Sequence, residues 1–446
     1  MDQRWRNYLC AKAPRYTSYP SAAQFDESVS SRDLRAKLAE VSLYEPLSLY
    51  VHVPFCRQLC WYCGCNMRVE NHYDRARQYV SALVAEIGVW GEALEGRGRP
   101  TSIHFGGGTP NYLTTGDLET LLMAIEREIG LTDDAALSIE IDPRLLRSHD
   151  SEALAGLGFR RFSLGIQDFD PEVQKSINRV QSYDLVEDCV SEIRAAGVRD
   201  LSFDVLYGLP KQTAQSFADT IDKVTALAPD RVSVFGYAHL PSALPHQRLI
   251  AAADLPDDAL RVALAELAGE KLIAAGYIPV GFDHYARPGN ELANAALNGR
   301  LKRNFQGFTS DAASTVVAFG ASAISFIDGL YAQNEKSISA YASRALKGDF
   351  AIARGLVRSR QESVVAAAIN DVLCRMAMNV GPILRNARPE EAVLICEQLD
   401  RLVSDGVISW REDTVEIAPG ARSLARIVAA AIDPYARWSQ NFTAAV

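Results

Sequence analysis

Short runs of β-branched and aromatic residues alternate with longer amphipathic stretches through most of the first 280 residues. Turn residues follow each short run, and most turns lead into a segment with apolar positions at helical spacing. One such segment, residues 74–90, places Ala76, Val80 and Ile87 on a single helix face. Repeated strand–helix units predict a parallel sheet covered by helices. The predicted strands are residues 47–53, 101–105, 137–141, 161–166, 201–206 and 231–235.

Six strand–helix units are two fewer than a closed (β/α) barrel of eight strands contains. We therefore expect an α/β fold with a partial (β/α)6 barrel, which with its extension spans residues 47–355 and follows an N-terminal arm at 1–46. The pattern changes beyond this point, where two helical stretches lead into a predicted β-hairpin at 406–417. Residues 356–446 are thus expected to form a small, mostly helical, winged-helix-like domain.

The composition is that of a globular protein of enzyme size. Of the 446 residues 48% are hydrophobic and 23% charged, which excludes a mostly disordered chain. The net charge of −9 has the wrong sign for broad nucleic-acid binding. No apolar signal core follows Met1, and the longest apolar stretch, residues 312–327, is too short and too often interrupted by hydroxyl residues to cross a membrane. We expect a cytoplasmic protein with no nucleic-acid partner and no membrane span.

Polar residues follow five of the predicted strands, at the end where parallel α/β folds place their chemistry. A carboxylate at such a position can alternatively serve only to cap the next helix. Recurrence at strand after strand favours a functional site at this edge of the sheet. The residues are Gly106 to Gly108, Glu140 with Asp142, Gln167 with Asp168, Asp204, and Tyr237 to His239.

Half of the eight cysteines lie between residues 56 and 65, in the loop after the first predicted strand. Cys56, Cys60 and Cys63 have the spacing C-x3-C-x2-C, so three thiolates could hold three irons of a [4Fe–4S] cluster and leave the fourth iron open to a ligand. A structural zinc site is the alternative, although zinc usually takes its ligands from two separated pairs. Cys65 is an extra thiol beyond the triad. The glycine run at 106–108 matches neither a Walker loop nor a dinucleotide fingerprint.

Taken together, the cysteine triad and the glycine-rich run after the next strand resemble the radical S-adenosylmethionine superfamily. Further motifs, in order along the chain, are similar to the family of oxygen-independent coproporphyrinogen III oxidases. They include Pro14 to Pro20, Cys63 to Asn66, Glu140 to Arg144, Gly165 to Phe169, Asn178 with Arg179, Asp204 to Thr213, Tyr237 to Pro241, Asp283 to Pro288 and Arg303 to Gly307.

The resemblance implies roles for individual residues. Cys56, Cys60 and Cys63 would bind a [4Fe–4S] cluster, whereas Cys65 would be a non-ligand cysteine with a catalytic role, as would Tyr50. Two S-adenosylmethionine molecules are implied. The first would contact Tyr50, Gly107, Glu140 and Ile324. The second would contact Tyr62, Gly108, Thr109, Gln167, Arg179, Asp204 and Ala238, with Phe305 and Gln306 nearby.

The same resemblance implies an activity in haem biosynthesis. Two propionates of coproporphyrinogen III would lose carbon dioxide without oxygen, giving the vinyl groups of protoporphyrinogen IX, after S-adenosylmethionine yields a 5′-deoxyadenosyl radical. An electron-donor protein would be a partner, and the enzyme is expected to be a monomer. The arm with Arg15 and Tyr16 would close over the substrate, and the arginine would suit a propionate. The competing interpretation is a haem-binding carrier of the same superfamily, which generally lacks both Cys65 and the Pro14 to Pro20 arm.

Overall fold

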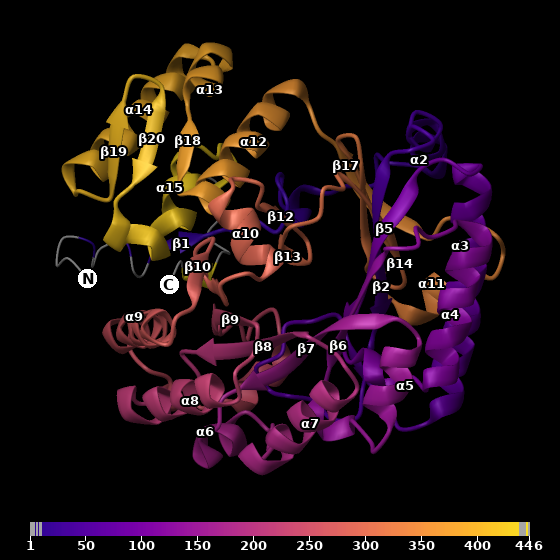
Figure 1. Cartoon of the computed structure of the whole chain (residues 1–446). Helices are drawn as coiled ribbons and strands as arrows, with labels where there is room; N and C mark the ends of the chain where they lie inside the picture. The colour runs from indigo at the N-terminus through magenta and orange to yellow at the C-terminus, as the bar shows by residue number, and fades with distance from the viewer. Residues whose placement is uncertain (1–4, 6–7, 9–10, 437–442, 445–446) are drawn as a thin grey trace.

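The fold is a curved, open sheet with helices on its outer face and a smaller C-terminal lobe beside it (Figure 1). The structure is a computed structural model, and it describes residues 5, 8, 11–436 and 443–444. Within this part of the chain the main sheet has 12 strands. In spatial order they are β10 (Ile278–Val280), β11 (His284–Ala286), β9 (Arg231–Gly236), β8 (Asp200–Tyr207), β7 (Phe159–Gln167), β6 (Ala136–Ile141), β5 (Arg99–Gly107), β2 (Pro46–Val53), β14 (Thr315–Phe319), β15 (Ile324–Ile327), β16 (Leu330–Asn334) and β17 (Ile352–Val357).

The six strands expected from the sequence are present and pair in parallel, from β2 through β5, β6, β7 and β8 to β9. Parallel pairing brings their carboxyl ends to one edge of the sheet. β14 adds a seventh parallel strand beside β2, and antiparallel strands extend the sheet beyond both ends of this set. These added strands make up the extension of the barrel, for which the sequence predicted only residue bounds and no strands.

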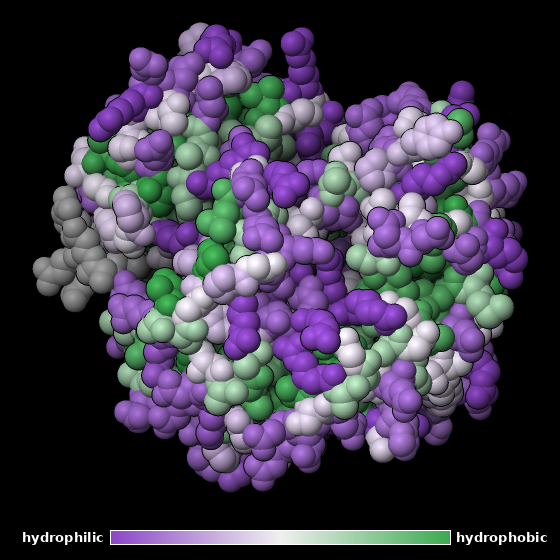
Figure 2. Space-filling model, viewed as in Figure 1, coloured by the Kyte–Doolittle hydropathy of each residue, from purple (hydrophilic) through white to green (hydrophobic). Residues whose placement is uncertain are grey.

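Alternating burial along the parallel strands explains the two faces of the curved sheet. In β8 every second residue is buried, while Ser202 and Asp204 point to the inner side. The inner side encloses a polar cavity of about 420 Å³, and hydrophilic residues surround a hollow in the middle of this face of the molecule (Figure 2). Each of the six strands contributes one serine to its lining: Ser48, Ser102, Ser138, Ser163, Ser202 and Ser233.

Helices cover the outer face because their apolar stripes pack on the sheet. In α3 the buried stripe runs from Ala76 to Leu94 and includes Trp90, whose ring packs edge-on against Phe319 and Phe350. The helices of this part are α2 (Ser31–Leu38), α3 (Tyr73–Leu94), α4 (Thr115–Glu128), α5 (Asp150–Gly156), α6 (Pro171–Ser176), α7 (Tyr183–Ala195), α8 (Ala214–Ala226), α9 (Asp258–Ala274), α10 (Glu291–Leu297) and α11 (Ile338–Ala345). None of the helices in the described residues is long and apolar enough to cross a membrane.

The C-terminal lobe contains the β-hairpin that the sequence predicts, here β19 and β20, with β18 as the third strand of a small sheet. Its elements are α12 (Arg360–Arg375), β18 (Ala377–Asn379), α13 (Gly381–Asn386), α14 (Pro389–Ser404), β19 (Ile408–Arg411), β20 (Thr414–Ile417), the 3-10 helix η7 (Pro419–Leu424) and α15 (Ala425–Ala431). Three short strand pairs complete the fold: β1 (Lys12–Ala13) with β21 (Thr443–Ala444), β3 (Phe55–Cys56) with β4 (Arg68–Val69), and β12 (Lys302–Asn304) with β13 (Gly307–Thr309).

The first part of the N-terminal arm, around residues 13–16, is fixed to the C-terminal lobe. Tyr16 donates from its hydroxyl to Asp433 Oδ2 at 3.0 Å, and both side chains are buried. Arg426 donates to the carbonyl of Pro14 at 2.9 Å and to that of Ala13. The arm therefore passes over the strand ends on its way to the first strand of the barrel.

Candidate active site

The cysteine-bearing loop follows β2 and is held in place by residues from distant parts of the chain. The Trp61 N–H donates to Ile177 O at 2.9 Å, and Asn178 Nδ2 donates to Leu59 O at 2.8 Å. Farther along the loop, Gln247 Nε2 donates to Tyr62 O at 3.0 Å. Because these bonds tie loop carbonyls and amides that lack a strand partner, the loop has a defined path over the strand ends.

The three thiols of the triad lie near different polar groups. Cys56 Sγ is 3.3 Å from Thr109 Oγ1, and Cys63 Sγ accepts from the Cys65 N–H at 3.4 Å. Cys60 Sγ faces two guanidinium groups, described below. Hydrogen bonding from Cys65 lowers the pKa of Cys63 to about 7, which favours the thiolate that ligates iron, whereas burial raises the pKa of Cys56 despite its contact with Thr109. Among the described residues no three His, Cys, Asp or Glu side chains converge on a position for a single metal ion. A cubane cluster, in contrast, takes its thiolates at separate irons.

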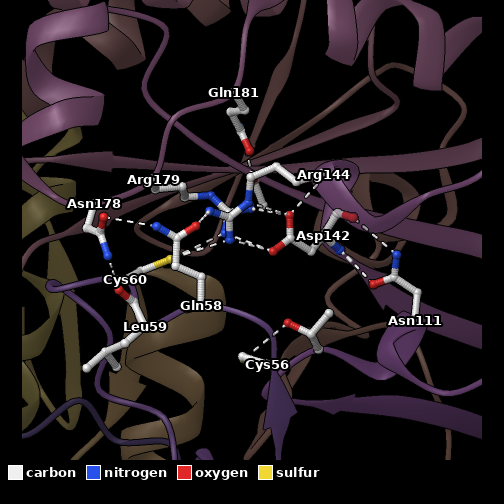
Figure 3. Close-up of polar contacts among 12 residues, drawn as sticks. Cys56, Gln58, Leu59, Cys60, Asn111, Asp142, Arg144, Asn178, Arg179 and Gln181 are labelled. Atoms are coloured by element: carbon white, nitrogen blue, oxygen red, sulfur yellow. Dashed lines mark hydrogen bonds and ion pairs between the residues drawn. The ribbon is translucent and has the colours of Figure 1, made fainter. Parts of the chain in front are cut away.

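Asp142, Arg144 and Arg179 form a buried charge cluster behind Cys60 (Figure 3). Arg144 Nη2 donates to Asp142 Oδ2 at 2.6 Å, and Arg179 Nη1 lies 3.4 Å from the same oxygen. Both Arg144 Nη2 and Arg179 Nη1 are 3.6 Å from Cys60 Sγ. Burial alone would raise the pKa of Asp142, but the two arginines outweigh it and lower that pKa. The cluster thus directs positive charge toward one sulfur of the triad.

Arg179 is further fixed by a 2.6 Å bond from Nη2 to Gly165 O, while its buried Nε has no hydrogen-bond partner among the described residues. A free donor at this depth suits a ligand carboxylate. The sequence predicted Arg179 as a ligand-binding residue. It did not single out Arg144, Asn178 or Gln247, although the first two lie within motifs already noted for the family resemblance.

The glycine run after β5 forms an open cradle beside the cysteine loop. Gly107 has φ +121°, and a Cβ there would lie 2.6 Å from the His52 ring. A Cβ on Gly106 would lie 2.9 Å from Glu140 Oε1, and one on Gly108 would lie 3.0 Å from Phe55 O. A side chain is therefore excluded at Gly107 and crowded at Gly106 and Gly108, which leaves the backbone free to approach a ligand.

Glu140 lies at the centre of a polar network around this cradle. Its Oε2 accepts from the Gly107 N–H at 3.1 Å, and its Oε1 is 3.3 Å from His104 Nε2. Burial raises the pKa of Glu140, but the bonds and charge of His104 outweigh it and the pKa is lowered. Tyr50 stacks on His104 with ring centroids 5.9 Å apart, and its hydroxyl is 3.0 Å from His52 Nδ1. An ionised Glu140 suits the ammonium group of an amino acid.

The remaining predicted contacts lie on neighbouring strand ends. Burial and the charge of Glu140 raise the pKa of Asp204 to about 6, and its Oδ2 accepts from Ser163 Oγ at 3.3 Å. Gln167 ends β7 with φ +68°, where the register with β8 shifts. Gln247 Nε2 donates both to Ala238 O, at 3.1 Å, and to Tyr62 O, and so links these two segments.

Ile324 opens β15, which lies on the far side of β14 from β2. The structure therefore brings most of the predicted residues to one edge of the sheet. Their roles as ligands remain predictions.

A cavity of about 850 Å³ lies between the strand ends and the C-terminal lobe. Cys65 and the predicted ligand contacts Phe305 and Gln306 line it, together with Arg15 of the arm and Tyr237. Cys65, the exposed thiol of the loop, therefore faces this space while its N–H bonds to Cys63. The cavity is large enough for a ligand of several hundred daltons.

Comparison with known proteins agrees with this arrangement. A model of the radical SAM superfamily matches residues 50–224, which contain the cysteine triad, the glycine cradle and Glu140. The fold and the site thus define a radical SAM protein. An oxygen-independent coproporphyrinogen III oxidase of Bradyrhizobium diazoefficiens is 39% identical over 95% of both chains, and that of Pseudomonas aeruginosa is 40% identical over 95% of this chain and 93% of its own.

A solved structure extends the likeness to nearly the whole fold. Coproporphyrinogen III oxidase from Escherichia coli, described as a radical SAM enzyme, superposes with a TM-score of 0.89 at 36% identity, covering 94% of this chain and 97% of its own. The chain belongs to the oxygen-independent coproporphyrinogen III oxidase family. The expected α/β fold is confirmed by this match.

Proposed function

We propose that the chain catalyses the anaerobic oxidative decarboxylation of two propionates of coproporphyrinogen III to the vinyl groups of protoporphyrinogen IX. One observation carries the proposal: Cys65, whose N–H bonds to Cys63 of the triad, lines the cavity of about 850 Å³, so the cysteine loop borders a space large enough for a porphyrinogen. Family membership over 95% of the chain supports the same reaction.

The donor set fits the family's [4Fe–4S] cluster and S-adenosylmethionine. Cys56, Cys60 and Cys63 would bind the cluster, since their sulfurs lie near hydroxyl, guanidinium and amide donors. When bound, these cofactors supply a 5′-deoxyadenosyl radical that takes hydrogen from a propionate. The protein's part is to position them and to exclude water and oxygen.

Polar side chains around the cradle would orient two S-adenosylmethionine molecules. Glu140 and the Gly107 backbone would hold the ammonium end of the first molecule, with Tyr50 alongside. Arg179 would bind the carboxylate of the second molecule, and Asp204 would bind its ammonium group. Cys65, which lines the cavity, would hold a proton at its Sγ next to the substrate.

The arm, the C-terminal lobe and the partners complete the proposal. Residues 14–20 would cover the substrate, because Tyr16 and Arg426 fix the arm over the strand ends. We assign the arm to residues 1–46, the catalytic barrel to 47–355 and the C-terminal domain to 356–446. The enzyme would work as a cytoplasmic monomer that takes electrons from a donor protein.

Anaerobic reconstitution with iron and sulfide, followed by a coproporphyrinogen III assay with S-adenosylmethionine and a reductant, tests the proposal. Formation of protoporphyrinogen IX is the expected result. The carrier alternative is not favoured, since the chain has both Cys65 and the Pro14 to Pro20 arm. Stoichiometric haem binding with no product in this assay would replace the enzyme by a carrier.

A further inference from the structure

Four arginine side chains line the large cavity: Arg15, Arg303, Arg422 and Arg426. They come from the arm, from β12 and from the η7 to α15 segment of the C-terminal lobe, so the cavity gathers them from three separate parts of the chain. Arginine presents a planar fork of donors that matches a carboxylate with two parallel bonds. The cavity is therefore chemically suited to a ligand with several carboxylates.

Arg303 has two buried donors that the described part of the protein leaves unused. Its Nε and Nη1 atoms are buried and have no hydrogen-bond partner among the described residues, and its Nη2 makes only a 3.5 Å contact with Arg15 O. The guanidinium lies over the rings of Phe282 and Phe308, 5.0 and 4.6 Å from their centroids. Buried donors without partners are costly, so a ligand that satisfies them gains the corresponding free energy.

The acidic side chains near the cavity do not fully neutralise its arginines. Asp283 is the carboxylate that acts on Arg303, Arg422 and Arg426, and it is itself paired with His284 at 2.6 Å. Glu266 and Glu270 of α9 also line the cavity. Burial lowers the pKa of Arg303 and Arg422, as expected where cations lack sufficient counter-charge.

The other two arginines have different positions. Arg426 already donates to the carbonyls of Ala13 and Pro14, so it positions the arm. Arg15 is exposed and makes one long bond to Gly236 O, at 3.4 Å. Arg303 and Arg422 are half-buried in the cavity wall, and within the described residues their only bond to the arm is the long contact from Arg303 Nη2 to Arg15 O, so most of their donors face the cavity.

We propose that Arg303 and Arg422 bind the propionates of the porphyrinogen that the reaction leaves in place. The inference rests on the proposed function and deepens it. A carboxylate that leaves as carbon dioxide loses its charge, so a bidentate arginine on that carboxylate would stabilise the reactant and oppose its departure. Arginine anchors therefore belong on the two propionates that persist in the product, which would hold the ring while the other two face the loop side of the cavity.

The test measures binding of two stable oxidised porphyrins to the reconstituted protein: coproporphyrin III, with four propionates, and protoporphyrin IX, with the two that remain. Replacing Arg303 by Met should weaken both by the same factor, about 10- to 100-fold for a lost charged pair. Arg422→Met should behave alike, and Arg303→Lys should recover part of the affinity. Arg32→Met, at an exposed position of α2, is the matched control and should change neither affinity.

Iron content and S-adenosylmethionine affinity serve as checks on folding, and both should match the unsubstituted protein in Arg303→Met and Arg303→Lys. Weakened binding of coproporphyrin III alone would place the arginines on the reacting propionates and overturn the inference. Unchanged binding of both porphyrins in Arg303→Met would also overturn the inference. So would a variant that loses S-adenosylmethionine affinity but keeps its affinity for the porphyrins. If the unsubstituted protein bound both porphyrins but did not convert coproporphyrinogen III, the proposed function would fail while the arginine site stood.

Discussion

Arg179 and Cys60 are 119 residues apart in the chain, and the arginine Nη1 lies 3.6 Å from the cysteine Sγ. With Arg144 at the same distance, this sulfur has two cations beside it. Positive charge next to a thiolate ligand stabilises the more negative, reduced form of a cluster. The pair therefore bears on how easily the cluster accepts an electron.

Replacing Arg179 by Gln should make the cluster harder to reduce. A unit charge acting over roughly 6 Å corresponds to about 2 to 3 kcal/mol at an effective dielectric constant of 20. A redox titration followed by electron paramagnetic resonance measures the midpoint potential, which should become more negative. Arg144→Gln is the comparison and should shift the potential in the same direction. An unchanged potential in both variants would show that the two arginines do not influence the reduction of the cluster.

Replacing Cys56, Cys60 or Cys63 by Ala should abolish cluster binding, while Cys65→Ala should retain about four irons per chain, as for a cubane with three protein ligands. Iron and sulfide analysis of anaerobically prepared protein measures this. Cys65→Ser should also keep the cluster but lose most product formation, because its thiol faces the cavity. One zinc per chain, lost equally in all four cysteine variants, would contradict the cluster assignment.

Gly107→Ala should weaken S-adenosylmethionine binding and destabilise the fold by about 1 to 3 kcal/mol, because φ +121° is strained for alanine and its Cβ would meet His52. Thermal unfolding and ligand titration measure the two effects. Gly96→Ala is the matched control, since Gly96 also has a positive φ, +76°, but no atom lies within 4 Å of its Cβ position. Equal S-adenosylmethionine affinity in the two variants would argue against a cradle at Gly107.

Glu86 should make stability depend on pH. Burial raises its pKa from 4.5 to about 7, although Tyr341, Gly320 and Asn334 donate to it and oppose the shift. The folded chain then holds this proton more tightly than the unfolded chain, so stability falls as pH rises from 4.5 through 7, by about 3 kcal/mol for this group.

The difference between the unfolding profiles of the unsubstituted protein and Glu86→Gln, followed from pH 6 to 8, isolates this contribution. The unsubstituted protein should lose stability across this range relative to the variant. Parallel profiles would mean that Glu86 is ionised throughout.

Deleting residues 1–20 should leave the cluster and S-adenosylmethionine binding intact while decarboxylation falls steeply, because Arg15 and Thr17 of the arm line the cavity and the described part of these residues makes no hydrogen bond to the triad. Iron analysis and ligand titration measure cofactor binding, and the product assay measures decarboxylation. Tyr16→Phe removes only the bond to Asp433. It should weaken the attachment of the arm to the C-terminal lobe by about 1 to 3 kcal/mol, because the buried carboxylate loses a donor. Full activity in the deletion would exclude a covering role.

The parallel strands and the cysteine loop could be predicted from sequence because both are local patterns: apolar runs for the strands and thiol spacing for the loop. The charge pair of Asp142 and Arg179 could not, since it depends on which strands become neighbours. The sequence also did not predict strands β14 to β17 as an extension of the sheet. The apolar run from Thr315 to Ile327 covers β14 and β15 and contains no helix that would mark a strand–helix unit. The arginine cavity combines the arm, β12 and the C-terminal lobe, a combination that no spacing along the chain reveals.

The pairing of β1 with β21 joins residues near the two ends of the chain, Lys12 with Ala444 and Ala13 with Thr443. The bonds that hold Leu59, Trp61 and Tyr62 of the cysteine loop come from residues up to Gln247, whereas the arm that forms the roof over the cavity is held by Arg426 and Asp433. During synthesis on the ribosome, the loop can therefore acquire its supports well before the roof is made. The cavity is therefore completed by residues made last, which bond to the arm that was made first.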